Sequence, residues 1–432
     1  MKTVLIVSPH FPPVNAADVH RIRVAMPYLR EFGWDAVVLA VQPDFVEGVR
    51  EPLLEKSLPP DVSVVRTKAL SIPWTRRLGI GNLGIRAFPF LYQAGREIIR
   101  KRNVDLVYFS TTVFTAMPLG RLWKRRFGIP FVLDMQDPWA SDYYKTRPAS
   151  ERSPKYRAAE RMHRILEPWT MKRVDGIVSV SRGYIRTLED RYPWLAGKPT
   201  TVLPFGGAEE DFCAVRKQPQ QNGFFDPHDG FIHGVYVGRG GHDMAHALRI
   251  IFRALKRGIE TCPDLFSKVR LHFVGTDYAC GDRARKTIEP VARECGVADR
   301  IQEWPLRIPY FQGLQLFLDS DFLVAPGSDD PQYTASKIYP YILARKPLLA
   351  VFHEASGVCD VLRATRAGEL LSFNPEHPLE TDIEHLLNIW SGILRKLPFK
   401  PLTDWTAFQP FTARRMAQSQ CCLFDAVTQC KR

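Results

Sequence analysis

One arginine in the second half of the chain lies where a strand ends and a helix begins. Arg239 belongs to the segment Gly238-Arg239-Gly240-Gly241, which follows the predicted strand 235–237 and precedes a predicted helix at 245–257. Exposed backbone N–H groups and the positive end of a helix dipole favour anions at such turns. A guanidinium at this place suits a diphosphate, which it can bind in bidentate fashion. The alternative is a turn arginine that faces solvent.

A second basic residue, Lys337, ends the loop 328–337, which follows the predicted strand 322–325 and precedes another predicted helix. Thr334 or Ser336 can cap that helix and leave backbone N–H groups for an anion. In a parallel sheet with helices on both faces, ligands bind at the carboxyl ends of the strands, where both loops would lie. The two loops therefore predict a clamp for a nucleotide diphosphate, and a plain helix cap is compatible with that role.

The first half of the chain places two carboxylates, Asp134 and Asp137, at the end of the predicted strand 130–134. A carboxylate there can orient or deprotonate a hydroxyl group, or it can simply cap a turn before Pro138. Further polar residues follow the neighbouring strands or lie on the first helix, and Arg21 either reaches the same edge or faces water. The candidates on this side are Pro13, Asn15, Arg21, Ser110, Thr111, Asp134 and Asp137.

Strands and helices alternate along both halves, which predicts an α/β fold with parallel sheets and right-handed crossovers. The first helix is predicted over 18–32 and ends at Gly33, the polar stretch 213–230 is predicted as a linker, and a helix at 283–295 is predicted in the second half. A chain of 432 residues fits two domains. We predict a Rossmann-like domain at 1–210, a second at 225–404 and a final segment, 405–432, whose helix packs back on the first domain.

The 8 cysteines are scattered, form no CxxC pair and have no histidine at zinc spacing. Reduced thiols in a cytoplasmic protein are the favoured interpretation, and no metal site is predicted. The apolar run near the start is too short for a secretory signal, and no apolar stretch is long enough to span a bilayer. A GxGxxG spacing is missing from the arginine loop, which argues against an NAD site.

The net charge of +13 is concentrated in the region 66–126. Aromatic residues are interleaved with the basic ones there, and such a face suits an anionic membrane surface. A basic face that is merely solvated is the alternative, while no nucleic-acid-binding motif accompanies the charge. The basic residues include Arg66, Lys68, Arg76, Arg77, Arg86, Arg96, Arg100, Lys101, Arg102, Arg121, Lys124, Arg125 and Arg126, and the aromatic ones are Trp74, Phe88, Phe90, Trp123 and Phe127.

The order of several short motifs resembles the GT-B glycosyltransferases, and especially those of the family-4 or group 1 type. The resemblance implies two facing Rossmann-like domains, a nucleotide-diphosphate-sugar donor held mainly by the second, and a metal-independent, usually retaining transfer without a cofactor. The motifs are Phe11-Pro12-Pro13, Asp137-Pro138-Trp139, Leu203-Pro204-Phe205-Gly206-Gly207, Val237-Gly238-Arg239, Ser336-Lys337-Ile338 and Lys346-Pro347-Leu348-Leu349.

Matched to the family, Arg239 takes the place of the diphosphate-binding arginine and Lys337 that of the lysine at a helix start. Asp137 takes the place of an acceptor-side aspartate, so the resemblance implies catalytic roles for Asp137, Arg239 and Lys337. The loop 306–309 would hold the base through main-chain bonds. The implied donor-binding residues are Gly238, Arg239, Gly240, Gly275, Thr276, Arg307, Ile308, Tyr333, Thr334, Ala335, Ser336 and Lys337.

The chain departs from the family pattern at three places. Pro340 replaces a glutamate that contacts the nucleotide ribose, the segment 242–246 lacks the usual second basic residue, and Asn15-Ala16-Ala17 replaces a glycine-rich loop. Without glycine the backbone is less free to approach a phosphate. Two alternatives to glycosyl transfer follow: a nucleotide-binding protein with impaired catalysis, and a sugar-nucleotide epimerase or hydrolase.

We therefore expect a cytoplasmic glycosyltransferase that takes part in the synthesis of a cell-surface polysaccharide. Its partners would be a nucleotide sugar and a saccharide or lipid-linked acceptor, with no nucleic acid. The basic region 66–126 would place it at the inner face of the membrane as a peripheral protein.

Overall fold

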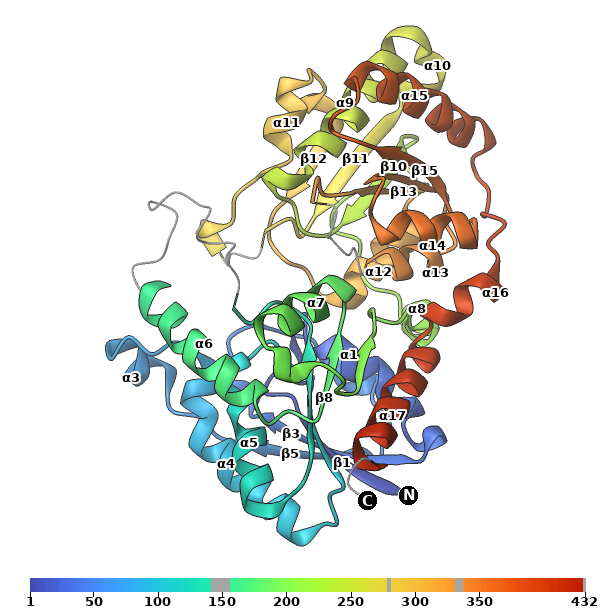
Figure 1. Ribbon diagram of the computed structural model, residues 1–432. Helices are drawn as coiled ribbons and strands as arrows, with labels where there is room; N and C mark the ends of the chain where they lie inside the picture. Colours follow the sequence, from blue (N-terminus) through green and yellow to red (C-terminus); the bar gives the residue numbers. More distant parts are fainter. Residues whose placement is uncertain (141–155, 278–280, 331–336, 430–432) are drawn as a thin grey trace. The chain divides into compact units, whose positions relative to one another are not determined.

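The computed structural model describes residues 1–140, 156–277, 281–330 and 337–429. The chain divides into two compact units (Figure 1). Unit 1 comprises residues 1–206 together with 413–432, and unit 2 comprises residues 207–412. Unit 1 is therefore built from both ends of the chain.

The described residues of unit 1 form a seven-stranded sheet with the order β5-β3-β1-β6-β7-β8-β9. Each neighbouring pair is parallel, so the carboxyl ends of all these strands meet at one edge. The strands are β1 (Lys2–Val7), β3 (Trp34–Val41), β5 (Ser63–Thr67), β6 (Leu106–Phe109), β7 (Phe131–Met135), β8 (Gly176–Ser179) and β9 (Thr200–Val202), and β2 (Val14–Asn15) pairs with β4 (Val49–Arg50) separately.

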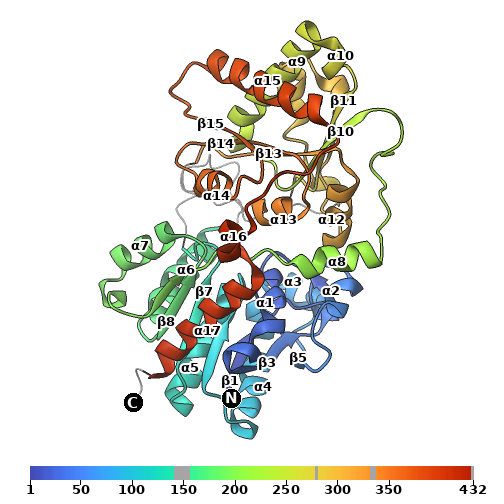
Figure 2. The ribbon, with the colours of Figure 1, turned by 90° about the vertical axis from the view of Figure 1, so that its right-hand side faces the viewer.

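Helices cover both faces of this sheet. The helices α4, α5 and α6 lie on one face, whereas α1 and α17 lie side by side on the other (Figures 1 and 2). The helices are α1 (Val19–Ala25), α2 (Pro52–Lys56), α3 (Ile72–Arg77), α4 (Leu83–Lys101), α5 (Pro118–Phe127), α6 (Tyr156–Met171), α7 (Arg182–Arg191) and α17 (Ala413–Gln429).

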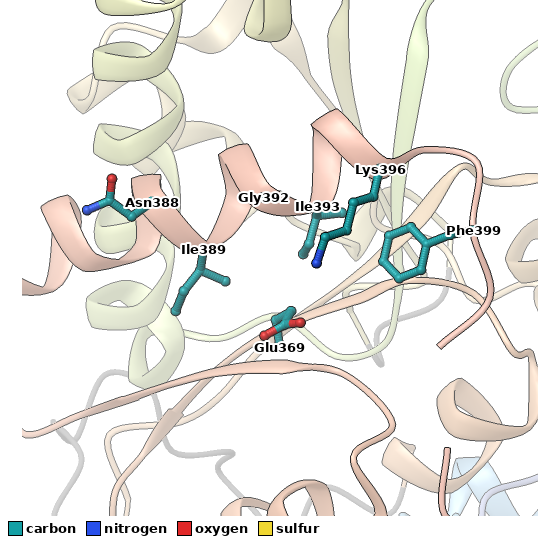
Figure 3. Close-up of a pocket in the computed structure, with 7 residues that line it drawn as sticks. All are labelled: Glu369, Asn388, Ile389, Gly392, Ile393, Lys396 and Phe399. Carbon is teal, nitrogen blue, oxygen red and sulfur yellow. The ribbon is translucent and has the colours of Figure 1, made fainter. Parts of the chain in front are cut away.

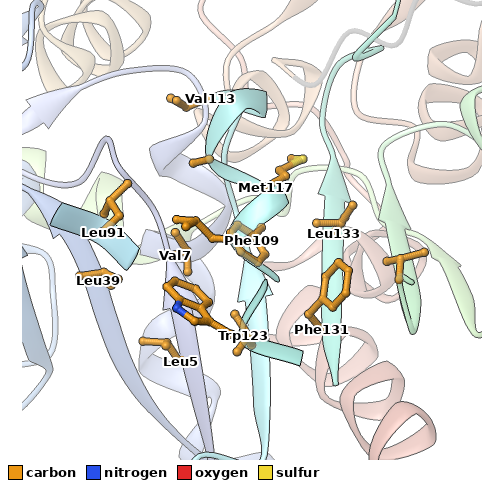
Figure 4. Close-up of a cluster of buried hydrophobic side chains, with 14 of the residues drawn as sticks. Leu5, Val7, Leu39, Leu91, Phe109, Val113, Met117, Trp123, Phe131 and Leu133 are labelled. Carbon is orange, nitrogen blue, oxygen red and sulfur yellow. The ribbon is translucent and has the colours of Figure 1, made fainter. Parts of the chain in front are cut away.

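The core between the sheet and helices α4 and α5 is aliphatic and aromatic (Figure 4). Trp123 of α5 is fully buried and stacks on Phe109 of β6 with 6.2 Å between the ring centroids. On the opposite face, Phe424 of α17 is also fully buried and lies 5.3 Å from the ring of Trp34. Burial of such rings stabilises each layer by removing a large apolar area from water.

Unit 2 repeats this architecture with a six-stranded sheet in the order β12-β11-β10-β13-β14-β15 among its described residues. All neighbouring pairs are again parallel. The strands are β10 (Ile232–Val237), β11 (Val269–Val274), β12 (Ile301–Trp304), β13 (Phe322–Pro326), β14 (Leu348–His353) and β15 (Glu369–Phe373). The helices are α8 (Glu209–Lys217), α9 (Ala245–Thr261), α10 (Pro263–Phe266), α11 (Glu289–Glu294), α12 (Tyr310–Asp319), α13 (Ile338–Leu343), α14 (Gly357–Thr365), α15 (Leu379–Lys396) and α16 (Trp405–Phe408).

Three predicted segments need correction. The helix predicted over 18–32 is α-helical only as far as Ala25, and the chain continues in short 3-10 turns around Pro27, which cannot donate a helical hydrogen bond. The predicted linker 213–230 begins later, because residues 213–217 still belong to α8. The helix predicted over 283–295 is shorter and starts only at Glu289.

Gly33 ends the first helical region in the left-handed conformation, with a φ of 83°, as its place in the sequence predicts. The final helix α17 runs over Ala413–Gln429 and contacts α1, β8 and β9 within unit 1.

The basic region 66–126 is also less uniform than its composition indicates. Trp123 belongs to the core, and Arg86 is buried with its guanidinium donating to the carbonyls of Leu70 and Phe45. Neither residue therefore contributes to a basic–aromatic surface.

Candidate functional site

A buried carboxylate, Asp18, connects three loops at the carboxyl edge of the unit 1 sheet. Asp18 precedes α1, but its side chain makes no hydrogen bond to that helix. It instead accepts hydrogen bonds from the hydroxyl of Thr111 at 2.9 Å and from the backbone N–H of Thr112 at 3.0 Å, both after β6. Its other partner is His10, which follows β1. The sequence did not single out His10 or Asp18 because these contacts depend on how the strands are ordered.

The imidazole of His10 lies with Nδ1 3.0 Å from Oδ2 of Asp18. Burial alone would lower the pKa of His10, but the charge and hydrogen bond of Asp18 raise it above the ordinary value. The pKa of Asp18 is correspondingly lowered, since the interactions with His10 and the two threonines outweigh its desolvation. The pair therefore favours an imidazolium next to a carboxylate.

Asp137, the predicted acceptor-side carboxylate, follows β7 at the same edge and is exposed to solvent. Desolvation and the nearby charge of Asp18 raise the pKa of Asp137 to about 6. Asp137 and Asp18 thus belong to one electrostatic cluster. A carboxylate with this pKa is within reach of proton transfer near neutral pH.

Arg21 and Asp134, both predicted on the acceptor side, form an ion pair with no solvent exposure of either side chain. Nε of Arg21 donates to Oδ2 of Asp134 at 2.9 Å, and its Nη1 donates to the carbonyl of Pro204 at 3.0 Å. Tyr108 and Gln136 also donate to Asp134. Both side chains are fully buried in this structure, and their role on the acceptor side stays a prediction.

Ser110 and Thr111 are likewise buried completely, so they support the edge rather than line it. Thr111 holds Asp18, and Ser110 accepts a hydrogen bond from Gln136 at 3.3 Å. Pro13, in the turn after β1, and Asn15, the last residue of β2, are partly exposed, and the Asn15 amide donates to Glu51 at 2.9 Å.

In unit 2, Arg239 lies immediately after β10, as predicted. Its guanidinium binds the carboxylate of Asp243 in bidentate fashion, with N–O distances of 2.9 and 2.5 Å. The pKa of Asp243 is lowered because the hydrogen bonds from Arg239 and Ser328 outweigh its desolvation. This pairing fixes the planar guanidinium at the end of the strand.

Gly240 and Thr276 join the loops that follow β10 and β11. The N–H of Gly240 donates to the carbonyl of Thr276 at 2.6 Å, and a Cβ at Gly240 would lie only 2.5 Å from the hydroxyl of Thr287. Glycine is therefore required for this close approach. The buried Glu303 of β12 accepts from the Thr276 hydroxyl at 2.6 Å and from backbone N–H groups at the start of α11. These contacts make the predicted arginine loop rigid.

The charges of two arginines from two loops of unit 2 act on a lysine from a third. Lys337 precedes α13, Arg307 follows β12, and Arg239 follows β10. Desolvation, then the charges of Arg307 and Arg239, lower the pKa of Lys337 to about 7, although the residue retains solvent access. Mutual repulsion of this kind is relieved when an anion binds among the three charges.

The remaining predicted donor-binding residues differ in how deeply they are buried, and some of them lie outside the described residues. Gly238 is buried, whereas Gly275 and Ile308 are half-buried, and Gly275 adopts a left-handed φ of 72°. Pro340, which the resemblance implies stands in place of a glutamate, lies inside α13. Four predicted residues lie outside the described residues: Tyr333, Thr334, Ala335 and Ser336.

A cavity of about 180 Å³ lies elsewhere in unit 2, between β15 and α15 (Figure 3). It begins at Glu369, the first residue of β15, and the side chain of Lys396 points toward it. None of the predicted site residues lines this cavity. Among the described residues, no group of three or more histidine, cysteine or acidic side chains could hold a metal ion.

Comparison with known protein families finds a match for most of the first segment of unit 1. Residues 19–206 match the family model of the glycosyl transferase 4-like domain. This part of unit 1 is similar to a glycosyl transferase 4-like domain. The match confirms the predicted resemblance over these residues. No curated protein sequence matches the chain.

Solved structures of known enzymes share the fold over nearly the whole chain. The complex of HepE from Anabaena with UDP-glucose has a TM-score of 0.57 at 16% identity, covering 99% of this chain and 100% of that one. Sucrose-phosphate synthase from Thermosynechococcus elongatus has a TM-score of 0.55 at 14% identity, with 100% and 97% covered. An E. coli structure described as trehalose-6-phosphate bound with UDP-2-fluoro glucose has a TM-score of 0.54 at 11% identity, with 100% and 98% covered.

These matches confirm the predicted α/β fold of the GT-B type. Within the part of the chain that the structure describes, no helix has the length and apolar character needed to cross a membrane.

Proposed function

We propose that the protein is a glycosyltransferase that transfers a sugar from a nucleotide-diphosphate donor to a saccharide or lipid-linked acceptor. The observation that carries the proposal is that Arg239 and Arg307 follow strands of the parallel unit 2 sheet and that the charges of both act on Lys337 at the start of α13. A diphosphate bound there would add negative charge beside these cations. HepE was solved with UDP-glucose, so a UDP-sugar is the first donor to test.

The expected chemistry follows from where charge develops. When the bond between the sugar and the diphosphate breaks, negative charge grows on the leaving phosphate, and Arg239 and Lys337 would stabilise it. On the acceptor side, the exposed Asp137 would orient the attacking hydroxyl. Retention of configuration, metal independence and the absence of a cofactor stay predictions from the resemblance. Proton NMR of the newly formed anomeric centre, with and without a chelator, tests the first two.

A thermal-shift panel tests the donor site. UDP, GDP, ADP, CDP and dTDP are compared on the wild type and on Arg239→Ala, with Arg249→Ala as the control. Arg249 is an exposed arginine of α9 that pairs with Glu294 at 2.9 Å, so its loss should leave nucleotide binding unchanged. We expect one diphosphate to raise the melting temperature of the wild type and the control, but not that of Arg239→Ala. A folded wild type that responds to none of them would contradict the proposal.

Catalytic impairment is the second candidate, and the observation that favours it is Pro340 within α13 in place of the family glutamate. A protein of this kind would bind a nucleotide diphosphate but leave a sugar nucleotide intact across a panel of acceptors. An epimerase or hydrolase would instead consume the donor when no acceptor is present. Measuring nucleotide release with and without acceptors separates these outcomes from glycosyl transfer.

We also propose that unit 1 binds anionic membranes through exposed apolar side chains of α3 and α6. Each helix exposes two large apolar side chains four residues apart: Trp74 and Leu78 at α3, and Ile165 and Trp169 on α6. Arg76 and Arg77 lie beside the first pair, and Arg121 lies over the ring of Trp169 at 4.2 Å. Apolar residues surrounded by basic ones suit an anionic interface.

Sedimentation with vesicles tests this surface. At low salt we expect the wild type to bind vesicles that contain anionic lipid and not neutral ones, and the double variant Trp74→Ser/Trp169→Ser to bind much less. Trp194→Ser is the matched control, because that exposed tryptophan lies outside α3 and α6. Equal binding by all three proteins, or no binding by the wild type, would contradict the membrane proposal without affecting the donor site.

A further inference from the structure

Arg239 of the proposed donor site is already paired with a carboxylate of its own unit. Asp243 lies four residues later, in the short 3-10 helix His242–Met244, and its Oδ1 and Oδ2 atoms accept hydrogen bonds from Nη1 and Nη2 of Arg239 at 2.9 and 2.5 Å. The resemblance implies a second basic residue in the segment 242–246. This chain instead has a negative charge in direct contact with Arg239.

Asp243 is fixed by more than the arginine. Its carboxylate also accepts a hydrogen bond from Ser328, and its main-chain carbonyl accepts one from the N–H of Asp329 at 2.8 Å. A Cβ at Gly241 would lie 2.3 Å from Oδ1 of Asp243, so a larger residue there would displace the carboxylate. The pair is therefore a built part of the loops that follow β10 and β13.

The negative charge of Asp243 acts beyond its own partner. The side chains of Arg239 and Asp243 are 26% and 34% exposed, so a ligand in solvent can approach both. In the neighbouring loop, desolvation and then the charge of Asp243 raise the pKa of Asp329. Two anions bound to one guanidinium lie well within a Debye length of about 8 Å, so salt screens their repulsion only weakly. A diphosphate on Arg239 would thus be repelled by Asp243.

The strength of this repulsion depends on the charge of the ligand, which differs between donor and product. In a nucleotide sugar the terminal phosphate is esterified to the sugar. When the bond from the anomeric carbon to the phosphate oxygen breaks, the electron pair stays on that oxygen. A terminal phosphate loses its second proton with a pKa of about 6, so the nucleoside diphosphate keeps the additional negative charge at neutral pH. The product is therefore repelled more strongly than the donor.

We propose that Asp243 is a specificity-determining residue, which weakens binding of the nucleoside diphosphate relative to the nucleotide sugar and so favours product release. This inference rests on the proposed donor site. The charges of Arg239, Arg307 and Lys337 attract the more negative ligand more strongly, so the cations alone favour the product. Asp243 opposes that preference without removing the attraction for the donor.

The variant Asp243→Asn tests the role, because asparagine keeps the size of the side chain and one oxygen that can accept from Arg239. Isothermal titration at neutral pH measures the Kd of UDP and of UDP-glucose. We expect the affinity for UDP to rise roughly tenfold and that for UDP-glucose roughly threefold. The ratio of the two Kd values is the decisive quantity, since a lost orientation of Arg239 would change both affinities by the same factor.

Two further variants serve as controls. Asp243→Glu keeps the negative charge and should restore a ratio near that of the wild type. Glu294→Gln removes a carboxylate from another bidentate pair of unit 2, with Arg249 at 2.9 and 3.1 Å, and should leave the ratio unchanged. Thermal unfolding verifies that each variant folds. If Asp243→Asn does not fold, Asp243→Ser removes the same charge and should shift the ratio in the same direction.

The outcomes separate this inference from the proposed function. If the wild type binds both ligands and the ratio is the same in Asp243→Asn, or shifts toward UDP-glucose, the role of Asp243 alone is overturned. A ratio in Asp243→Glu that equals that of Asp243→Asn would also overturn it, because the charge would then not be responsible. If the wild type binds neither UDP nor UDP-glucose, the uridine donor site and the role of Asp243 fail together.

Discussion

Among single residues, Lys337 has a charge that should respond to pH within the physiological range. Desolvation and the charges of Arg307 and Arg239 lower its pKa to about 7, so in the free protein it loses its proton as the pH rises above that value. A bound diphosphate favours the protonated ammonium and raises the pKa again. Binding of a nucleotide sugar should therefore take up a proton above pH 7, and its affinity should decrease between pH 6 and pH 8.5.

Isothermal titration in two buffers of different ionisation enthalpy measures that proton uptake. In Lys337→Arg the charge stays on at every pH, so the affinity should no longer depend on pH in this range. The same pH dependence in the wild type and in Lys337→Arg would show that another group is responsible.

The buried ion pair of Arg21 and Asp134 makes a prediction about stability. Arg21→Met leaves the carboxylate of Asp134 buried without its cationic partner, which should cost about 3–5 kcal/mol in the free energy of unfolding. Arg30→Met is the control, because Arg30 is about half-exposed and its pair with Asp35 should contribute less than about 1 kcal/mol. Urea unfolding measures both values. Equal effects of the two substitutions would contradict a structural role for the buried pair.

The residues of the candidate site could be predicted from the sequence only where they stand next to a recognisable strand or helix pattern. Arg239 and Lys337 follow strands whose apolar runs are easy to recognise, and the structure places both after such strands. Arg21 and Asp134 were predicted at this edge of the sheet, but their burial could not be predicted, because sequence spacing does not show which side chains are exposed. His10 and Asp18 have no local signal at all, since Thr111 and Thr112, which hold Asp18, come from the loop after β6, about ninety residues further along the chain.

Among the elements, α9 and α15 of unit 2 each contain an internal glycine, and the two glycines have opposite surroundings. A Cβ at Gly258 of α9 would lie 2.6 Å from the ring of Phe266, which is fully buried. A Cβ at Gly392 of α15 would meet nothing within 4 Å. Gly258→Ala should therefore destabilise unit 2 by about 1–3 kcal/mol through overpacking. Gly392→Ala should stabilise it by about 0.4–1 kcal/mol, because alanine restricts the unfolded chain.

Thermal unfolding of the two variants shows whether each substitution lowers or raises the stability of unit 2. A lower melting temperature for Gly258→Ala together with a higher one for Gly392→Ala is expected. If Gly258→Ala were also stabilising, α9 and α10 would have to pack less closely than the contact with Phe266 indicates.

Element boundaries could be predicted where the chain carries a strong stop signal and not where composition misleads. Gly33 marks the end of the first helical region correctly. The stretch 213–230 resembles a linker because it is polar, yet Glu209, Glu210 and Asp211 provide acidic residues in the first turn of α8, and Arg216 and Lys217 provide basic residues in its last turn. These charges favour a helix at 209–217, and a search for caps and terminal charges would have found it.

At the scale of the whole molecule, each unit repeats one arrangement: a parallel sheet whose strands end at loops that carry charged side chains. The alternation of apolar runs and amphipathic segments was sufficient to predict this arrangement twice, because parallel strands joined by helices have few alternatives. The sequence pattern alone does not show which distant segments of the chain pack together in one unit. Unit 1 needs α17, which is more than two hundred residues away in sequence from the end of its main part at Gly206.

Removal of α17 should therefore unfold unit 1 selectively. Eight residues of this helix are buried, and Phe424 packs on Trp34 of β3 and Tyr108 of β6 with ring centroids 5.3 and 5.0 Å apart. A chain ending at residue 412 would expose that face of the sheet, so its strands should lose hydrogen-exchange protection while β10, β11, β13 and β14 of unit 2 keep theirs. Phe424→Ala should have a milder effect of about 3–5 kcal/mol. Full protection of β1, β3 and β6 in the shortened chain would show that unit 1 folds without its last helix.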